Sequence, residues 1–267
     1  MFQPELKEPI KTLDLPLGGQ ASPIGALNLL MDFIEIAASE KDKPKEQWAI
    51  NTDDEDGLKT VDALKKCMRV MKRVTGNEPG SMGLHPAVYF YNHRGKHSDY
   101  LFLAVVSLFS EALQNNDTLF FKKFSNCRHT LEEFLVRNKA VINQSIIQIG
   151  SSSRVNRLKI MFKELITSFT NKEDINVEKL LSILKLEGKL VAAELQNATK
   201  AFTKESKSAI YLKQSLDNAV SCPICNGYID STRSLSYDHI ERVREGGTGT
   251  IENGQITHPY CNSAIKN

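Results

Sequence analysis

Residues 222–262 read CPICNGYIDSTRSLSYDHIERVREGGTGTIENGQITHPYCN, and this stretch decides how the C-terminal end of the chain folds. It opens with Cys222-Pro-Ile-Cys225 and closes with His258-Pro-Tyr-Cys261, so two residues separate the members of each pair. Such pairs turn tightly enough to place two ligand atoms on one tetrahedral ion, and a Cys3His set is typical of structural zinc sites. Because four protein ligands fill the coordination sphere, we expect this zinc to be structural rather than catalytic. A module of about 50 residues also needs such a staple to fold.

Other interpretations of these cysteines are weaker. One alternative is that the two pairs are unrelated turns beside a buried histidine. Another is that Cys222 and Cys225 form a redox pair. The redox interpretation is disfavoured because that motif accompanies a βαβ pattern, which the surrounding sequence lacks. The two remaining cysteines, Cys67 and Cys127, lie in helical patterns, and we expect them to be buried small apolar residues.

The 32 residues between the two pairs are more than a plain zinc ribbon needs. They contain Tyr237-Asp238-His239-Ile240, then Gly246-Gly247, then Asn253, and Asn262 follows the last ligand directly. In this order and spacing the segment resembles the HNH endonuclease superfamily, the ββα-metal nucleases. The resemblance implies two strands and a helix around a catalytic cation, with the glycine pair permitting the turn between the strands.

The resemblance also implies a role for each residue of the motif. His239 would be the general base that activates water. Asp238 and Asn262 would hold a divalent cation, Mg2+ or Mn2+, which prefers oxygen ligands. Asn253 would brace the loop that carries the histidine. Lys266, four residues after Asn262, would lie on the same helix face and contact a phosphate.

Two departures from the family pattern stand out. His258 occupies a position where many relatives have cysteine, which should change metal affinity more than chemistry. The sequence runs for only five residues after Asn262, so we expect a short final helix that needs support from the rest of the chain.

Upstream of the module the sequence predicts a helical region, which makes the chain an α+β protein that is mostly α-helical. We expect an N-terminal arm at 1–23, a helical domain at 24–217 and the HNH module at 218–267. Apolar residues at helical spacing predict the following helices: 24–38, 58–74, 99–114, 117–149 with one break, 154–169, 177–196 and 199–217. The aromatic and β-branched segment 85–91 predicts a short strand.

The formal charge of +2 is nearly neutral, but residues 121–163 hold nine Lys and Arg against two Glu. Such a density would neutralise phosphates along DNA, and Arg154 and Arg157 beside the break at 150–153 are the best candidates for phosphate contacts. The alternative is a solvated helix face whose charges are compensated by nearby acids.

A second, less specific resemblance covers residues 25–267. The segment MGLHPAVYFY at 82–91 and the apolar run from Phe102 resemble the C-terminal half of bacterial proteins in which a ParB-like nucleotidase domain precedes an HNH module. This resemblance implies a role in restriction or phage defence, and a chain that is a split subunit or a fragment with a nucleotidase partner. His85, His93, Arg94 and His97 would form a second polar site or serve turns and caps.

These observations favour a metal-dependent HNH endonuclease that acts on DNA. The alternative is a zinc-stabilised nucleic-acid-binding or accessory subunit that acts with a nucleotidase partner. The longest apolar run is too short to cross a membrane, so no membrane association is expected. We expect a cytoplasmic location, because no apolar signal segment follows Met1. Cutting of both strands by a one-site module would favour a homodimer.

Overall fold

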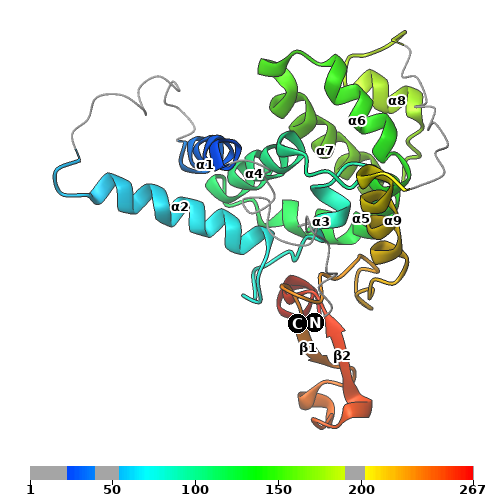
Figure 1. Ribbon diagram of the computed structural model, residues 1–267. Coiled ribbons are helices and arrows are strands. Elements are labelled where there is room, and N and C mark those ends of the chain that lie inside the picture. Colours follow the sequence, from blue (N-terminus) through cyan, green and yellow to red (C-terminus); the bar gives the residue numbers. More distant parts are fainter. Residues whose placement is uncertain (1–22, 40–53, 190–201, 267) are drawn as a thin grey trace.

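The computed structural model describes residues 23–39, 54–189 and 202–266, and within them a helical body carries a small module at its C-terminal end (Figure 1). The helices of the body are α1 (Pro23–Ala38), α2 (Leu58–Val74), α3 (Pro86–Tyr89), α4 (Asp99–Gln114), α5 (Thr118–Arg137), α6 (Lys139–Gln148), α7 (Arg154–Thr170), α8 (Val177–Ile183) and α9 (Lys204–Asp217). Of these described helices, none is both long and apolar enough to cross a membrane.

Helix α4 lies at the centre of the body, and most of its own side chains are apolar and buried. It packs against α1, α2 and α7, and α5 packs against α7 on the other side. Phe109 on α4 makes edge-on ring contacts with Phe121 and Phe124 on α5. Burial of a helix on all sides is expected where apolar residues leave no polar stripe.

Most of the expected helices are confirmed, with bounds that differ by a few residues. α2 and α4 have the expected limits, and the long pattern at 117–149 breaks once, at Asn138 between α5 and α6. The Asp117 side chain caps α5 by accepting a hydrogen bond from the Phe120 amide at 2.9 Å. The arm at 1–23 falls outside the described residues except for Pro23, which begins α1.

Two expected elements are wrong. The segment 85–91 is not a strand: Pro86 begins the short helix α3, and only Tyr91 bridges to His97. Proline suits the first turn of a helix, and the aromatic residues that suggested a strand are buried in the core instead. The helix expected at 177–196 ends at Ile183, because Lys185 and Gly188 take left-handed backbone conformations, with φ of 55° and 70°. Residues 190–196 of that expectation lie outside the described part.

The C-terminal module is built on two short antiparallel strands. β1 (Ser236–His239) pairs with β2 (Gly254–Thr257), and a π-helical turn, η6 (Cys261–Ile265), packs against β1. Short 3-10 turns, η4 (Val243–Glu245) and η5 (Ile251–Asn253), lie in the connection between the strands. Cys222, Ile229 and Cys261 form a small core of their own, while Tyr260 belongs to the core of the helical body. A two-stranded sheet is only marginally stable alone, so the module depends on further contacts, among them those with the body.

Candidate metal centre and active site

Cys222, Cys225, His258 and Cys261 come together at the base of the module. Their ligand atoms all lie within 4.8 Å of one another, and three of the four side chains are buried. The Cys225 Sγ to His258 Nδ1 distance is 3.3 Å, close to the separation of about 3.6 Å between ligands on a tetrahedral zinc. The cluster is therefore compatible with a structural zinc.

The ring of His258 is held in the orientation that metal binding needs. Its Nε2 lies 3.0 Å from the Tyr228 carbonyl oxygen, which assigns the ring proton to Nε2 and leaves Nδ1 facing the sulfur atoms. Burial lowers the pKa of His258, which favours the neutral ring that ligates a metal. Hydrogen bonds from Cys225 and Cys261 lower the pKa of the Cys222 thiol, so one thiolate forms readily at this point.

The residues of the expected active site lie at the end of β1 and on η6. Asp238 pairs with Gln255 across the sheet, and Gln255 Nε2 donates to Asp238 Oδ2 at 2.8 Å. Asn262 Nδ2 donates to the Tyr237 carbonyl at 3.2 Å and to Ser236 Oγ at 2.9 Å, so η6 is fixed to β1 beside the carboxylate. A carboxylate oxygen and an amide oxygen on these two elements are ligands that a hard divalent cation prefers.

Lys266 does not point away from this cluster. Its Nζ lies 2.7 Å from Asp238 Oδ2 and also donates to the carbonyl of His239, and the two side chains are only 15% and 9% exposed. The ammonium group of Lys266, a cation of the chain itself, therefore lies against the carboxylate of Asp238. This position differs from the phosphate contact expected from the sequence.

The loop after His239 is closed by Asn253. The Asn253 side chain accepts a hydrogen bond from the Glu241 amide at 2.7 Å and donates to the carbonyls of Glu241 and Thr248. Gly246 has a left-handed φ of 104°. A Cβ at Gly247 would lie 1.9 Å from the Glu241 carbonyl oxygen, so only glycine fits. These contacts fix the loop next to the histidine.

A buried ion pair beneath the module escaped the sequence analysis. Arg128 on α5 is fully buried, and its Nε lies 2.6 Å from Glu132 Oε1. Its two other nitrogens donate to the carbonyls of Met82, Gly83 and Tyr228. Glu132 also accepts from the Tyr228 amide, at 2.6 Å. This pair joins the helical body to the segment that follows the first cysteine pair, and only its i, i+4 spacing signals it in the sequence.

The segment between α2 and α3 forms the rest of the seat. Ser234 Oγ hydrogen-bonds Thr75 Oγ1 and accepts from the Gly76 amide, and Asn77 Oδ1 accepts from the Leu235 amide. On the helix side of the module, the Tyr260 amide donates to the Ser81 carbonyl at 2.9 Å. The short final turn thus has the support from the body that its length requires.

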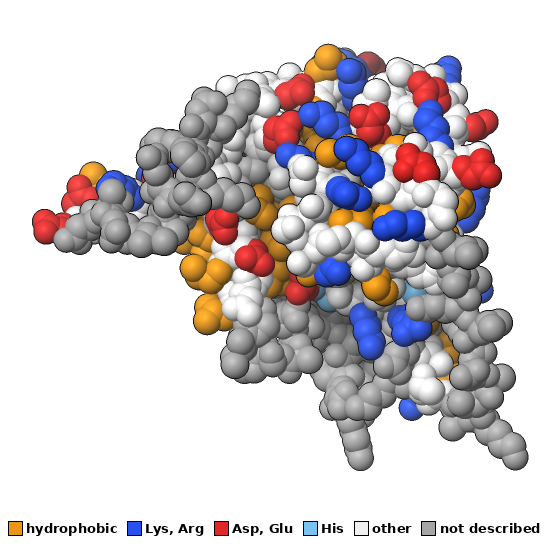
Figure 2. All heavy atoms as spheres, turned by 90° about the horizontal axis from the view of Figure 1, so that it is seen from above, with side chains coloured by type: hydrophobic (Ala, Val, Ile, Leu, Met, Phe, Trp, Pro, Cys, Tyr) orange, Lys and Arg blue, Asp and Glu red, His pale blue; other side chains and the backbone are white. Residues whose placement is uncertain are grey.

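The basic residues expected to hold phosphates have other partners. Arg154 donates to the Ile149 carbonyl and to Tyr100 Oη, and Arg157 donates to the Leu184 carbonyl. The remaining members of the basic stretch that are engaged within the body are Arg128, Lys139, Lys159 and Lys163. Figure 2 shows acidic and basic side chains interspersed over the face of the body that it views. Three of these six side chains, Arg128, Lys159 and Lys163, meet acids, and the other three donate to carbonyl or hydroxyl oxygens.

The histidine cluster separates into individual contacts. His85 is buried against the ring of Tyr228, with ring centroids 6.5 Å apart, and burial lowers its pKa. His97 Nδ1 lies 2.6 Å from Asp99 Oδ1, at the start of α4. Among the described residues, the cysteine and histidine cluster of the module is the one group of three or more such side chains arranged to hold a metal. His85, His93 and His97 are not part of it.

Comparison with known families agrees with this geometry. Residues 222–267 match the family model described as HNH endonuclease, which indicates a nuclease domain in the module. The match does not extend to the helical body, so the resemblance to nucleotidase-linked proteins stays a prediction. No curated protein and no solved structure matches the chain.

Proposed function

We propose that residues 222–267 form a metal-dependent endonuclease that hydrolyses phosphodiester bonds in DNA, with Zn2+ in the Cys3His cluster as its structural ion. The observation that carries this proposal is the placement of Asp238, His239 and Asn262 on one short strand and on the turn that packs against it. Asp238 and His239 end strand β1, and the Asn262 side chain is hydrogen-bonded to the same strand. The match to the HNH endonuclease family supports the reaction type.

Asp238 and the amide oxygen of Asn262 would hold the catalytic cation, Mg2+ or Mn2+. The fit rests on their oxygen ligands and on Lys266, whose ammonium group already lies against Asp238 Oδ2 as a stand-in cation. When bound, the cation would stabilise negative charge on the scissile phosphate and on the leaving oxygen.

His239 would act as the general base. Its imidazole takes a proton from water as the water oxygen forms a bond to phosphorus, and the bond from phosphorus to the leaving oxygen breaks. That oxygen then takes a proton from solvent. Asn253 would position His239 by closing the loop that follows it, through its bonds to Glu241 and Thr248.

A plasmid-nicking assay with Mg2+ or Mn2+ tests this function. We expect the wild-type chain to nick supercoiled DNA and His239→Ala to lose about 100-fold or more, the usual contribution of a general base. His129→Gln is the matched control: His129 is an exposed histidine on α5, and glutamine can keep a donor for the Asn226 carbonyl, which lies 3.1 Å from His129 Nδ1.

Equal activity of wild type and His239→Ala on DNA and RNA, or no activity of either, would overturn the proposal. DNA binding without cleavage under either metal would favour the alternative, a zinc-stabilised binding or accessory subunit. Cleavage that appears only after addition of a ParB-like nucleotidase would show that the module works as part of a split enzyme.

For the biological setting we propose bacterial restriction or phage defence in the cytoplasm, on the resemblance of residues 25–267 to such proteins. A homodimer would supply two active sites for a double-strand cut. Sedimentation of the free chain and of the chain on DNA would measure its state.

A further inference from the structure

The most basic helix of the described chain is α2, outside the stretch that the sequence singled out. Residues 63–74 contain five Lys and Arg and no acidic residue. They are the last twelve residues of the 17-residue helix, which extends from the body and ends above the module (Figure 1). Of these five, Lys66 pairs with Asp62 at 2.8 Å and Arg73 donates to the Gly80 carbonyl. Lys65, Arg69 and Lys72 are the exposed basic side chains of the segment.

The two sides of α2 have different roles. Ala63, Cys67, Val70 and Val74 are buried toward α1 and α4. Lys65, Arg69 and Lys72 are spaced by four and three residues, so they form one row on the opposite, exposed side. The row is about 10 Å long at 1.5 Å per residue.

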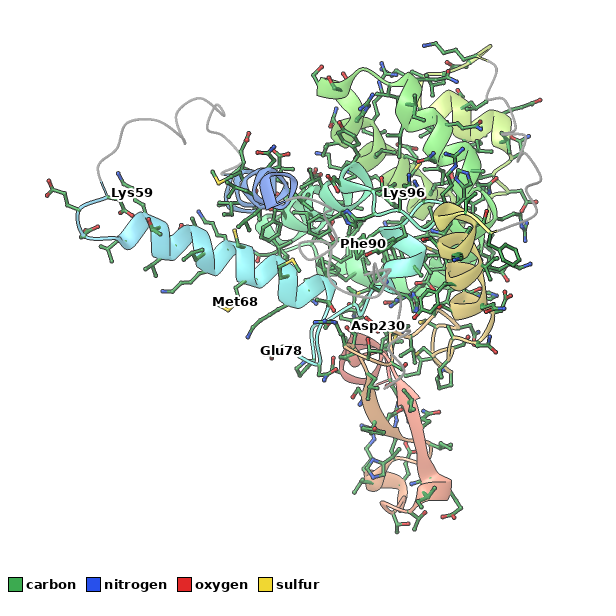
Figure 3. All side chains as sticks on the ribbon, in the orientation of Figure 1. Lys59, Met68, Glu78, Phe90, Lys96 and Asp230 are labelled. Atoms are coloured by element: carbon green, nitrogen blue, oxygen red, sulfur yellow. The ribbon has the colours of Figure 1, made fainter. Side chains whose placement is uncertain are left out.

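The row leads directly to the proposed active site. Figure 3 shows Met68 along the helix and Glu78 beyond its end, next to the module. One turn after Lys72, Thr75 and Gly76 bond to Ser234, which is two residues from the serine that holds Asn262. Adding these helix and strand steps puts Lys72 within about 20 Å of Asn262.

We propose that α2 is the arm that holds duplex DNA for the nuclease, with Lys65, Arg69 and Lys72 on the phosphates of one strand. This inference rests on the proposed function. A 10 Å row spans about three phosphates at 3.4 Å per nucleotide along the axis. The module itself cannot supply this charge, since residues 218–267 carry four Lys and Arg against five Asp and Glu.

The assignment to α2 also follows from the fate of the other basic side chains. Six of the nine in residues 121–163 bind acids or carbonyls within the body, as described above. On α2, Lys72 shares its charge with Glu78 across an exposed contact of 2.9 Å, which solvent weakens. An exposed pair of this kind opens at little cost when a phosphate approaches.

Salt-dependent DNA binding tests the arm. A labelled 30-base-pair duplex would be titrated with the His239→Ala chain between 50 and 200 mM salt, alone and with Lys65→Gln, Arg69→Gln and Lys72→Gln combined. Loss of three phosphate contacts should reduce the slope of log K against log salt by about 2.7, a change of roughly 40-fold over this range. The loss should be the same for unrelated sequences, because phosphate contacts carry no base information.

The matched control removes three exposed lysines from the far end of the body: Lys172→Gln, Lys185→Gln and Lys189→Gln. It should keep the slope of the parent. Circular dichroism would confirm that both triple variants fold.

Three results would overturn the arm. The first is an α2 variant with the same salt slope as the parent, although the parent binds DNA and the wild type cleaves it. The proposed nuclease activity would then be retained, and DNA would bind another surface. The second is an α2 variant that differs from the parent only in its oligomeric state. That result would assign this side of α2 to a second copy of the chain, which would contact Leu64 and Met68, each 53% exposed beside the row. A wild-type chain that neither binds nor cleaves DNA would remove the proposed function and the arm together.

Discussion

Removal of the buried guanidinium at position 128 should destabilise the chain more than any other single change in its basic residues. In Arg128→Met, Glu132 keeps its charge in a buried site and loses the partner at 2.6 Å. The carbonyls of Met82 and Gly83 lose their donors as well. Breaking one side of a buried ion pair costs about 3–5 kcal/mol, a large part of the 5–15 kcal/mol that holds an ordinary domain together.

Urea unfolding followed by circular dichroism measures this loss. The midpoint should fall by more than about 1 M, given slopes of roughly 1–3 kcal/mol per M. Arg137→Met, an exposed arginine on the same helix, is the matched control and should stay within about 0.5 kcal/mol of wild type. A second readout is local: zinc should pass to a chelator faster in Arg128→Met, because Tyr228 between the cysteine pair and the strands is held by both members of the ion pair.

The double variant Arg128→Met with Glu132→Leu separates the ion pair from simple packing. With both charges gone no buried charge lacks a partner, so the double variant should lose less than the sum of the single losses. A single variant as stable as the Arg137→Met control, or strictly additive losses, would show that this pair does not hold the module on the body.

Three further outcomes are expected. Metal analysis should find one zinc per chain. Cys225→Ser should lower both the zinc content and the melting temperature, while Cys67→Ala should keep the zinc. A wild type whose melting temperature is the same with and without zinc would contradict the structural site. Lys266→Ala should bind Mn2+ about fivefold more tightly by electron paramagnetic resonance, because no ammonium group then competes for Asp238; equal affinity would contradict that competition. Burial lowers the pKa of Lys139 to about 7, below its value in the unfolded chain. The unfolded chain therefore binds more protons above pH 7, and Lys139 should raise the free energy of unfolding of the wild type by up to about 1.4 kcal/mol per pH unit there. Lys139→Met should lack this rise, and parallel curves of stability against pH for the two chains would refute the prediction.

The elements that the sequence predicted well are those set by local pattern. The apolar spacing of α2 and α4 fixes which side is buried, and the polar residues at Asp117 and Asn138 mark helix ends without help from distant contacts. The segment from His85 to Tyr91 failed because its composition suits a strand equally well, and only its burial under α9 and α5 decides for a helix turn.

The cluster of three cysteines and one histidine was predictable for the same local reason, since each pair is a turn of four residues. The contacts that seat the module were not. Arg128 meets Tyr228 across 100 residues, and Ser234 meets Thr75 across 159. Neither periodicity nor a spacing rule links such positions. A count of charges at 121–163 likewise does not show which side chains have partners inside the fold, such as Arg128 with Glu132 and Arg157 with the Leu184 carbonyl.

These long-range contacts change what the helical body does for the site. Two strands of four residues and a five-residue turn are too small to hold Asp238, His239 and Asn262 in place by themselves. The body fixes β1 from one end through Ser234 and Leu235. It fixes η6 through the Tyr260 amide and through the Arg73 guanidinium group, whose central carbon lies 5.8 Å from the centroid of the Tyr260 ring. The cysteine and histidine cluster then ties the first cysteine pair to the segment between β2 and η6. α2 ends directly before Thr75, Gly76 and Asn77, which hydrogen-bond the two residues that precede β1. The helical body is therefore part of the candidate active site's framework.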